Sequence, residues 1–452
     1  MNKIGIIADD MTGATTVGVL LARAGVRTAA YFDLQKATHL DELDAIVLSS
    51  DSRALDKESA QREVKIAMRS LKNMGANYYS KRIDTTLRGG IGYEVDAMLE
   101  EMEEGTIAVM VPAMPQSNRI LVGGYSVIDG VALSKTQVAR DVRTPIKESH
   151  VPTMYAKQTN RKIGQVGLSS ILAGKEFIKS ALMEQRENGA TVIIVDAIKL
   201  EDVDLIAEAV IELNWSVLSI DPGPFSTALS KLRGLNTNPS IENVDSQIDI
   251  GNEDGIVIAG IGSATTITKK QISALQENSF VASVSVNPVN LINQETQEQE
   301  IKKSFEAMKS MLENEHIKIG LVETALGHNV LDLDEIERKY GLEKGEAAKR
   351  INTSLGKIIN MVIREAKRKR EVKGLYVTGG DTMISILKTI GASGIFLKDY
   401  VIPQTDLGNI LGGEFEGMVV IGKGGLTGKE DTAISAMNRI FYENKIKNER
   451  CV

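Results

Sequence analysis

The chain has 452 residues, 42% of them hydrophobic, and carries a formal net charge of -7. This length exceeds what one hydrophobic core usually supports, so we expect two domains. The negative balance argues against a broad nucleic-acid or acidic-membrane surface, because such surfaces need clustered cations.

Short apolar runs alternate with amphipathic segments through the first half of the chain. One such segment, residues 58–74, has helical periodicity. The alternation is typical of a parallel sheet covered by helices. The runs predict strands at residues 4–8, 28–32, 45–49, 78–81, 106–111, 191–195 and 216–221.

A polar segment rich in turn-forming residues, 235–254, separates this half from the next. We place the boundary there and predict domains at 1–240 and 241–452. The alternation then resumes, with helices expected at 266–276 and 345–369. Strands are expected at 255–261, 280–286, 317–323, 374–378 and 417–421. The predicted fold class is α/β, with two domains that each contain a mainly parallel sheet flanked by helices, and with an interdomain cleft.

Two adjacent carboxylates, Asp9 and Asp10, follow the first predicted strand. Ligands of open parallel sheets bind at this edge, so the pair indicates proton or metal handling. The alternative is that one aspartate caps the following helix. A phosphatase with an aspartate nucleophile needs carboxylates two positions apart, and a dehydrogenase needs Gly-x-Gly-x-x-Gly here. Both classes are disfavoured.

The fourth predicted strand leads into a basic loop. It combines the cations Lys81, Arg82 and Arg88 with the carboxylate of Asp84 and the glycines at 89–90. Cations that a nearby carboxylate holds in place, beside glycines that allow close backbone approach, indicate a site for an oxygen-rich anion. The alternative is that these are ordinary surface cations.

Two further arginines, Arg53 and Arg119, follow the third and fifth predicted strands. Both fall on the same sheet edge as Asp10, so they can point into one cleft. Cations and carboxylates converging there suggest phosphoryl transfer to a hydroxy acid.

Glycine-rich segments end three strands of the second half, at residues 259–266, 377–382 and 422–425. Free amides at a helix N-terminus bind phosphate, although Asp381 or Thr382 could serve as a simple helix cap. The third loop fails the Walker spacing at two positions. Lys423 stands where glycine is needed, and Glu430 follows Lys429 where serine or threonine is needed.

These motifs resemble those of the four-carbon acid-sugar kinase family, ATP-dependent enzymes that phosphorylate threonate, erythronate or oxo-tetronate. The similarity runs nearly from end to end. The matching motifs are residues 7–14, Ser52-Arg53, residues 81–89, Pro112–Pro115 with Arg119, Gly262-Ser263, Gly379–Thr382 and Lys423–Gly425.

The resemblance implies that the N-terminal domain binds the sugar acid, that the C-terminal domain binds ATP, and that transfer occurs across the cleft. The candidate substrate-binding residues are Asp10, Arg53, Lys81, Arg82, Ile83, Asp84, Arg88 and Arg119. The candidate nucleotide-binding residues are Gly262, Ser263, Gly379, Gly380, Asp381, Thr382 and Gly424.

Our hypothesis is that Lys81, Arg53 and Arg88 hold the carboxylate and hydroxyls of the substrate. Asp10 or Asp84 then accepts the proton of the terminal hydroxyl as it attacks ATP. We expect Asp84→Asn to abolish turnover in a folded protein. D-threonate is the favoured substrate; D-erythronate, 3-oxo-tetronate and a non-catalytic sugar-acid and nucleotide sensor are the alternatives.

Mg²⁺ is expected to arrive with ATP, because no protein cage for a metal is visible. The four histidines, His39, His150, His316 and His328, lack metal-ligand spacing.

The single cysteine, Cys451, excludes an internal disulfide and favours a reducing compartment. No apolar stretch approaches the roughly 20 residues of a membrane span, and the early aspartates leave no room for a secretory leader. We expect a cytoplasmic protein without nucleic-acid or membrane partners, and a homodimer is left open.

Overall fold

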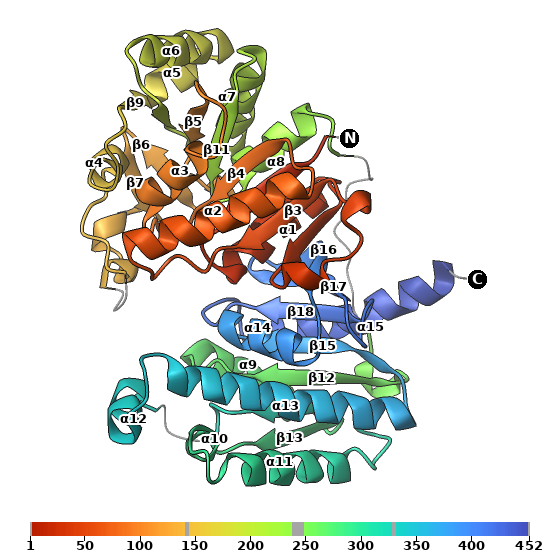
Figure 1. Cartoon of the computed structure of the whole chain (residues 1–452). Coiled ribbons are helices and arrows are strands. Elements are labelled where there is room, and N and C mark those ends of the chain that lie inside the picture. Colours follow the sequence, from red (N-terminus) through yellow and green to blue (C-terminus); the bar gives the residue numbers. More distant parts are fainter. Residues whose placement is uncertain (1, 141–143, 237–247, 328–330, 451–452) are drawn as a thin grey trace. The chain divides into compact units, whose positions relative to one another are not determined.

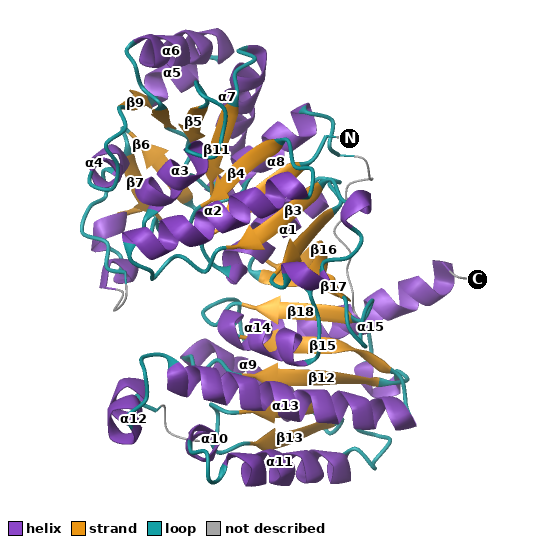
Figure 2. Cartoon of the chain, in the orientation of Figure 1, coloured by secondary structure: helices purple, strands orange, loops and turns teal. Residues whose placement is uncertain are grey.

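The computed structural model describes residues 2–140, 144–236, 248–327 and 331–450. The chain divides into two compact units, one of residues 1–31 and 39–241 and the other of residues 32–38 and 242–452. The boundary predicted between residues 240 and 241 lies outside the described residues. In each unit, helices flank both faces of a sheet (Figure 2), so the predicted α/β class is confirmed.

The first unit contains a parallel sheet in the order β2-β3-β1-β4-β11-β5-β10-β9 (Figure 1). All strands predicted in this half are present, with ends within two residues of the predicted ones, and β9 was not predicted. Their bounds are β1 Ile4–Ala8, β2 Thr28–Tyr31, β3 Ala45–Ser49, β4 Tyr78–Arg82, β5 Ile107–Met110, β9 Ile163–Val166, β10 Val192–Val195 and β11 Val217–Asp221.

The connections leave the sheet toward opposite faces. The chain passes from β1 to α1 on one face, whereas β3 and β4 lead to α2 and α3, which pack together on the other. This follows from right-handed crossovers, since β1 connects in one direction along the sheet and β3 and β4 in the opposite direction. The bounds are α1 Met11–Arg23, α5 Leu168–Ala173, α6 Lys175–Glu187, α7 Leu200–Glu212 and α8 Pro224–Leu232 on the first face, and α2 Lys57–Asn73, α3 Ile91–Leu99 and α4 Val151–Ala156 on the second.

Helix α2 shows why these segments are helical. The Asp56 carboxylate caps it by accepting a hydrogen bond from the Ser59 N–H at 3.0 Å. Its buried residues lie on one stripe and are Ala60, Val64, Ala67, Met68 and Leu71. The helix therefore packs one face on the sheet and exposes the other.

A small antiparallel sheet follows β5 and was not predicted. It consists of β6 Arg119–Val122, β7 Tyr125–Ile128 and β8 Val131–Ala132.

The second unit has the sheet order β13-β14-β12-β15-β18-β17-β16. Strands β12 to β15 and β18 are mutually parallel, whereas β17 runs antiparallel to both its neighbours. The strand bounds are β12 Ile256–Ile261, β13 Val281–Ser285, β14 Ile319–Glu323, β15 Val372–Thr378, β16 Gly394–Ile402, β17 Thr405–Leu411 and β18 Val419–Lys423.

Helices α9 and α15 contact each other on one face of this sheet, and α11, α13 and α14 form a continuous layer on the other. The helix bounds are α9 Thr266–Gln276, α10 Pro288–Ile292, α11 Gln297–Met311, α12 Leu333–Tyr340, α13 Glu346–Lys369, α14 Gly380–Thr389 and α15 Thr432–Arg450. Within the described residues, every helix is too short or too polar to cross a lipid bilayer.

Candidate active site

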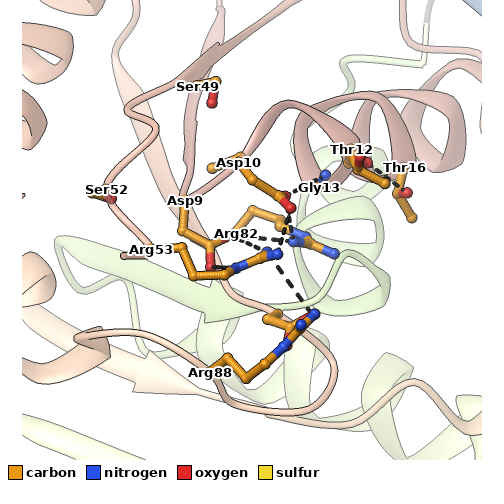
Figure 3. A network of polar contacts seen from close by, with 12 residues as sticks. Asp9, Asp10, Thr12, Gly13, Thr16, Ser49, Ser52, Arg53, Arg82 and Arg88 are labelled. Carbon is orange, nitrogen blue, oxygen red and sulfur yellow. Dashed lines mark hydrogen bonds and ion pairs between the residues drawn. The ribbon is translucent and has the colours of Figure 1, made fainter. Parts of the chain in front are cut away.

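Three carboxylates and three arginines meet where β1, β3 and β4 end (Figure 3). We call these six residues the charged cluster. They are Asp9, Asp10, Arg53, Arg82, Asp84 and Arg88; Figure 3 labels each of them except Asp84. Because β1 turns to one face of the sheet and β3 and β4 turn to the other, their loops bring these residues together at the sheet edge where ligands bind.

Asp9 and Arg53 form the anchor of the cluster. The Arg53 guanidinium donates to both carboxylate oxygens of Asp9, from Nε at 2.7 Å and from Nη2 at 2.9 Å. Burial alone would raise the pKa of Asp9, but the adjacent charge of Arg53 lowers it. Asp9 is therefore a fixed negative charge that orients Arg53.

Asp10 begins helix α1 and faces the same arginines. Its Oδ1 accepts the Gly13 N–H at 2.7 Å, and its Oδ2 lies 2.5 Å from Nη1 of Arg53. Burial raises the pKa of Asp10 against the opposing charges of Arg53 and Arg82. Its side chain is 30% exposed, compared with 4% for Asp9 and 8% for Asp84, so it is the most accessible of the three carboxylates.

Gly13 makes room for the neighbouring arginine. A Cβ at this position would collide with the guanidinium group of Arg82. That guanidinium lies 3.3 Å from Asp9 and 3.5 Å from Asp10 through Nη1. A residue without a side chain therefore lets Arg82 reach the first turn of α1.

Asp84 organises the basic loop. It accepts hydrogen bonds from Nε of Arg88 at 2.7 Å and from the Thr86 hydroxyl, and it lies 3.9 Å from Nη2 of Arg53. Burial opposes ionisation, but the hydrogen bond from Arg88 and the charge of Arg53 hold the pKa of Asp84 well below its usual range. Asp84 is thus a permanent carboxylate within its loop.

Three of the residues predicted to bind substrate make other contacts in the structure. The Lys81 ammonium lies 2.7 Å from Glu94 of α3, and both side chains are 1% exposed. Ile83 is buried, and Nη1 of Arg119 donates to the Ser117 carbonyl at 2.6 Å. No contact within the described residues joins Arg119 to the charged cluster. Direct substrate contacts by these three residues stay predictions, and the buried pair favours a supporting role for Lys81.

Glu94 was missed by the sequence reasoning. It stands in an amphipathic helix that gives no local sign of a buried acid. Only the folded chain places its carboxylate against Lys81.

A pocket of about 430 Å³ adjoins the charged cluster in the first unit. Arg53 and Gly89 line it on the cluster side, and Tyr93, Lys147 and Lys157 are among its other walls. This volume accommodates a small polar ligand.

In the second unit, the three predicted glycine loops meet at the ends of β12, β15 and β18. The Gly379 N–H donates to the Lys423 carbonyl at 3.0 Å, and the Gly262 N–H donates to the Thr378 carbonyl at 3.3 Å. The Thr265 hydroxyl donates to the Gly425 carbonyl. We call these loops the amide-lined site.

This site fits the phosphates of a nucleotide. Helix α14 starts after Gly379, which has a φ of 96° and offers no side-chain cap. The first amides of the helix have no partner within it, and such amides bind phosphate oxygens. Thr382 uses its hydroxyl to reach Oδ1 of Asn352 at 2.9 Å, which fixes this turn against α13.

Lys423 forms hydrogen bonds to the loop after β18 and to helix α9. Its ammonium donates to the Gly424 carbonyl at 2.7 Å and to the Thr427 carbonyl at 3.4 Å, and it reaches the Thr268 hydroxyl at 3.3 Å. Burial lowers the pKa of Lys423 to about 8. The sequence analysis included this lysine in a family motif but not among the site residues.

No metal-binding group of three or more histidine, cysteine, aspartate or glutamate side chains occurs in the part of the chain that the structure describes. His328, one of the four histidines, lies outside that part.

Comparison with known proteins covers both halves. Residues 4–229 match a family model described as a sugar-binding N-terminal domain, and residues 258–433 match one described as a nucleotide-binding C-terminal domain. A D-erythronate kinase of Heliobacterium modesticaldum is 34% identical over 452 residues, which are 99% of each chain. A D-threonate kinase of Salmonella typhimurium is 26% identical, with 96% of this chain and 97% of that protein covered.

Solved structures share the fold. A Haemophilus influenzae protein, HI1011, superimposes with a TM-score of 0.73 at 21% identity, over 96% of this chain and 100% of its own. The sequence similarity over nearly the whole chain goes further than the fold: the protein belongs to the four-carbon acid-sugar kinase family and is an ATP-dependent kinase, as its motifs predict.

Proposed function

We propose that this kinase uses ATP to phosphorylate the terminal hydroxyl of a four-carbon sugar acid, that the first unit binds the acid, and that the second binds ATP. One observation supports this division of roles above all. The parallel strands of the first unit end in a charged cluster that contains an accessible carboxylate, whereas β15 of the second unit leads into a helix N-terminus that no side chain of its N-cap residue, Gly379, caps. Transfer across the interdomain cleft expected from the sequence completes the proposal.

Asp10 is our candidate for the base that receives the hydroxyl proton. It is more exposed than the other two carboxylates of the cluster, and its pKa is raised by burial. A base works best when its pKa lies nearer the operating pH, so Asp84, with its strongly lowered pKa, suits the task less well. Arg53 and Arg88 would stabilise negative charge on the reacting oxygens.

The amide-lined site would hold the phosphates of ATP. The N-terminal amides of α14 and the loops at Gly262 and Gly424 would supply donors, and Lys423 joins the Gly424 loop to the first turn of α9. ATP supplies the phosphoryl group, and a Mg²⁺ ion bound with it would neutralise phosphate charge.

D-Erythronate is the first acid to test. The relative named D-erythronate kinase is 34% identical over nearly the whole chain, whereas the relatives named D-threonate kinase are 26% identical. D-Threonate, which the sequence analysis favoured, differs from D-erythronate only in the configuration at the carbon next to the carboxylate. Discrimination between the two therefore depends on residues near the bound carboxylate.

The experiment is a coupled ADP-release assay with D-erythronate, D-threonate, 3-oxo-tetronate and their enantiomers where these exist. We expect kcat/KM to be highest for D-erythronate. A higher value for D-threonate would restore the original prediction. ADP release with none of these acids would contradict the proposed function and favour the sensor alternative.

A further inference from the structure

The charged cluster has no surplus positive charge with which to attract an acid. Its three arginines face the carboxylates of Asp9, Asp10 and Asp84, and beneath them Lys81 is paired with Glu94. A carboxylate entering this balanced set gains little net attraction. The negative end of a sugar acid therefore needs cations elsewhere.

The pocket beside the cluster supplies them. Two of its lining residues, Lys147 and Lys157, are exposed, and neither forms an ion pair with any described residue. One acid, Glu148, also lines the pocket; the hydrogen bond from the His150 N–H lowers its pKa, and the charge of Lys157 adds to this. The two lysines still leave the pocket with a positive surplus next to Arg53.

Gln158 fixes the position of Lys157 relative to the basic loop. Its Nε2 donates to the Gly89 carbonyl at 3.2 Å, and its Oε1 accepts the Gly92 N–H at 2.8 Å. The end of α4 is thus held against the loop that carries Arg88. The backbone of Lys157, one residue before this clamp, is held with it.

We propose that this pocket is the carboxylate subsite of the sugar acid and that Lys157 binds the carboxylate, so that Lys157 selects acids over neutral polyols. The inference rests on the proposed function and deepens it. Arg53 lines this pocket and its Nη1 lies 2.5 Å from Asp10, so a substrate with its carboxylate at Lys157 would present its other end toward Asp10. Gln158 is a positioning residue for both sides of the pocket.

The test compares Lys157→Met with the unaltered protein, using D-erythronate and the neutral tetritol erythritol as acceptors. We expect the KM for D-erythronate to rise at least tenfold, while the KM for ATP and the rate with saturating erythritol stay unchanged. The preference for the acid over the tetritol should fall by the same factor. Lys157→Arg, which keeps the charge, should recover part of it.

Lys57→Met is the matched control. Lys57 lines the neighbouring pocket together with Lys157 but is absent from the wall of the proposed subsite. Its removal should leave the KM for D-erythronate unchanged. Because Lys157 is exposed, we expect the thermal unfolding midpoint of Lys157→Met to equal that of the unaltered protein.

Two results would overturn the inference while the kinase function stands. One is an unchanged KM for D-erythronate in Lys157→Met. The other is an equal loss of activity with the acid and with erythritol, which indicates a structural role. Failure of the proposed function itself would be distinct, because the unaltered protein would then release ADP with no four-carbon acid.

Discussion

Asp10 and Asp84 both face Arg53, yet their surroundings push their pKa values in opposite directions. Burial outweighs the arginine charges at Asp10 and raises its pKa, whereas the hydrogen bond from Arg88 keeps the pKa of Asp84 low. When the environments of two carboxylates push their pKa values apart, one commonly acts as proton acceptor and the other as a fixed charge. Two substitutions test this division.

For Asp10→Asn, we expect kcat to fall by about 10²- to 10⁴-fold, the range for loss of a general base. Asparagine still caps α1 by accepting the Gly13 N–H, so thermal stability should stay close to that of the unaltered protein. In the unaltered protein, kcat should fall as the pH drops through the raised pKa of Asp10, since the protonated acid cannot accept a proton. Near-normal turnover in the variant would exclude Asp10 as the base.

The matching variant is Asp84→Asn. It releases Arg88 and removes a neighbour of Arg53, so we expect turnover to be lost or strongly reduced in a folded protein. Any residual activity should keep the acid limb of the pH profile, because Asp10 remains. If the limb disappears in Asp84→Asn and persists in Asp10→Asn, the two assignments must be exchanged.

Lys423 gives a prediction about stability. Its pKa is about 8 in the folded protein and near 10.5 in the unfolded chain, so between these values the unfolded state binds more protons. The free energy of unfolding should therefore gain a favourable contribution from this lysine as the pH rises from about 8 to 10.5. Lys423→Met should lack this gain. Denaturant unfolding of both proteins at pH 7.5 and pH 10 measures the difference, and parallel changes would show that the pKa is not lowered.

At the scale of elements, two glycine substitutions can separate a role of the turn before α14 in nucleotide binding from the cost of backbone strain. Gly379→Ala places a Cβ 3.1 Å from the Thr382 hydroxyl and forces alanine to a φ of 96°, which costs on the order of 1–3 kcal/mol. Gly417 has a φ of 80° and open space around it, so Gly417→Ala is a control for strain alone. We expect both variants to lose stability but only Gly379→Ala to raise the KM for ATP, measured by initial rates. Equal KM values would remove this turn from the nucleotide site.

The sequence predicted most of the strands but not those stabilised by distant partners. The strands before Asp9 and before the glycine loops are regular apolar runs, and they appear as expected. The hairpin of β16 and β17 was missed because polar residues interrupt its pattern. One of them, Asp399, is 1% exposed and is satisfied by Arg439 of α15, 2.8 Å away, which no local pattern reveals.

The same limit applies to the site. Periodicity and the position of strand ends correctly brought Asp9, Asp10, Arg53 and the basic loop to one sheet edge. They could not show that these charges neutralise one another, since that depends on pairs such as Arg53 with Asp9, separated by 44 residues. The pocket lysine Lys157 was missed because it follows no strand of the sheet and belongs to no recognised motif.

For the whole molecule, the proposed function gives each unit one chemical task, and catalysis depends on both. With a net charge of -7, the protein as a whole repels anions, so both the acid and ATP must be attracted by local cations and amides. This organisation is consistent with a family whose models match the two halves separately.

Identification of the product tests the central claim most directly. Phosphorus NMR of a reaction that contains the protein, D-erythronate, ATP and Mg²⁺ should show a phosphomonoester coupled to the terminal methylene protons, formed in equal amounts with ADP. Release of inorganic phosphate without a phosphoester, or a phosphate placed on an inner hydroxyl, would contradict the account.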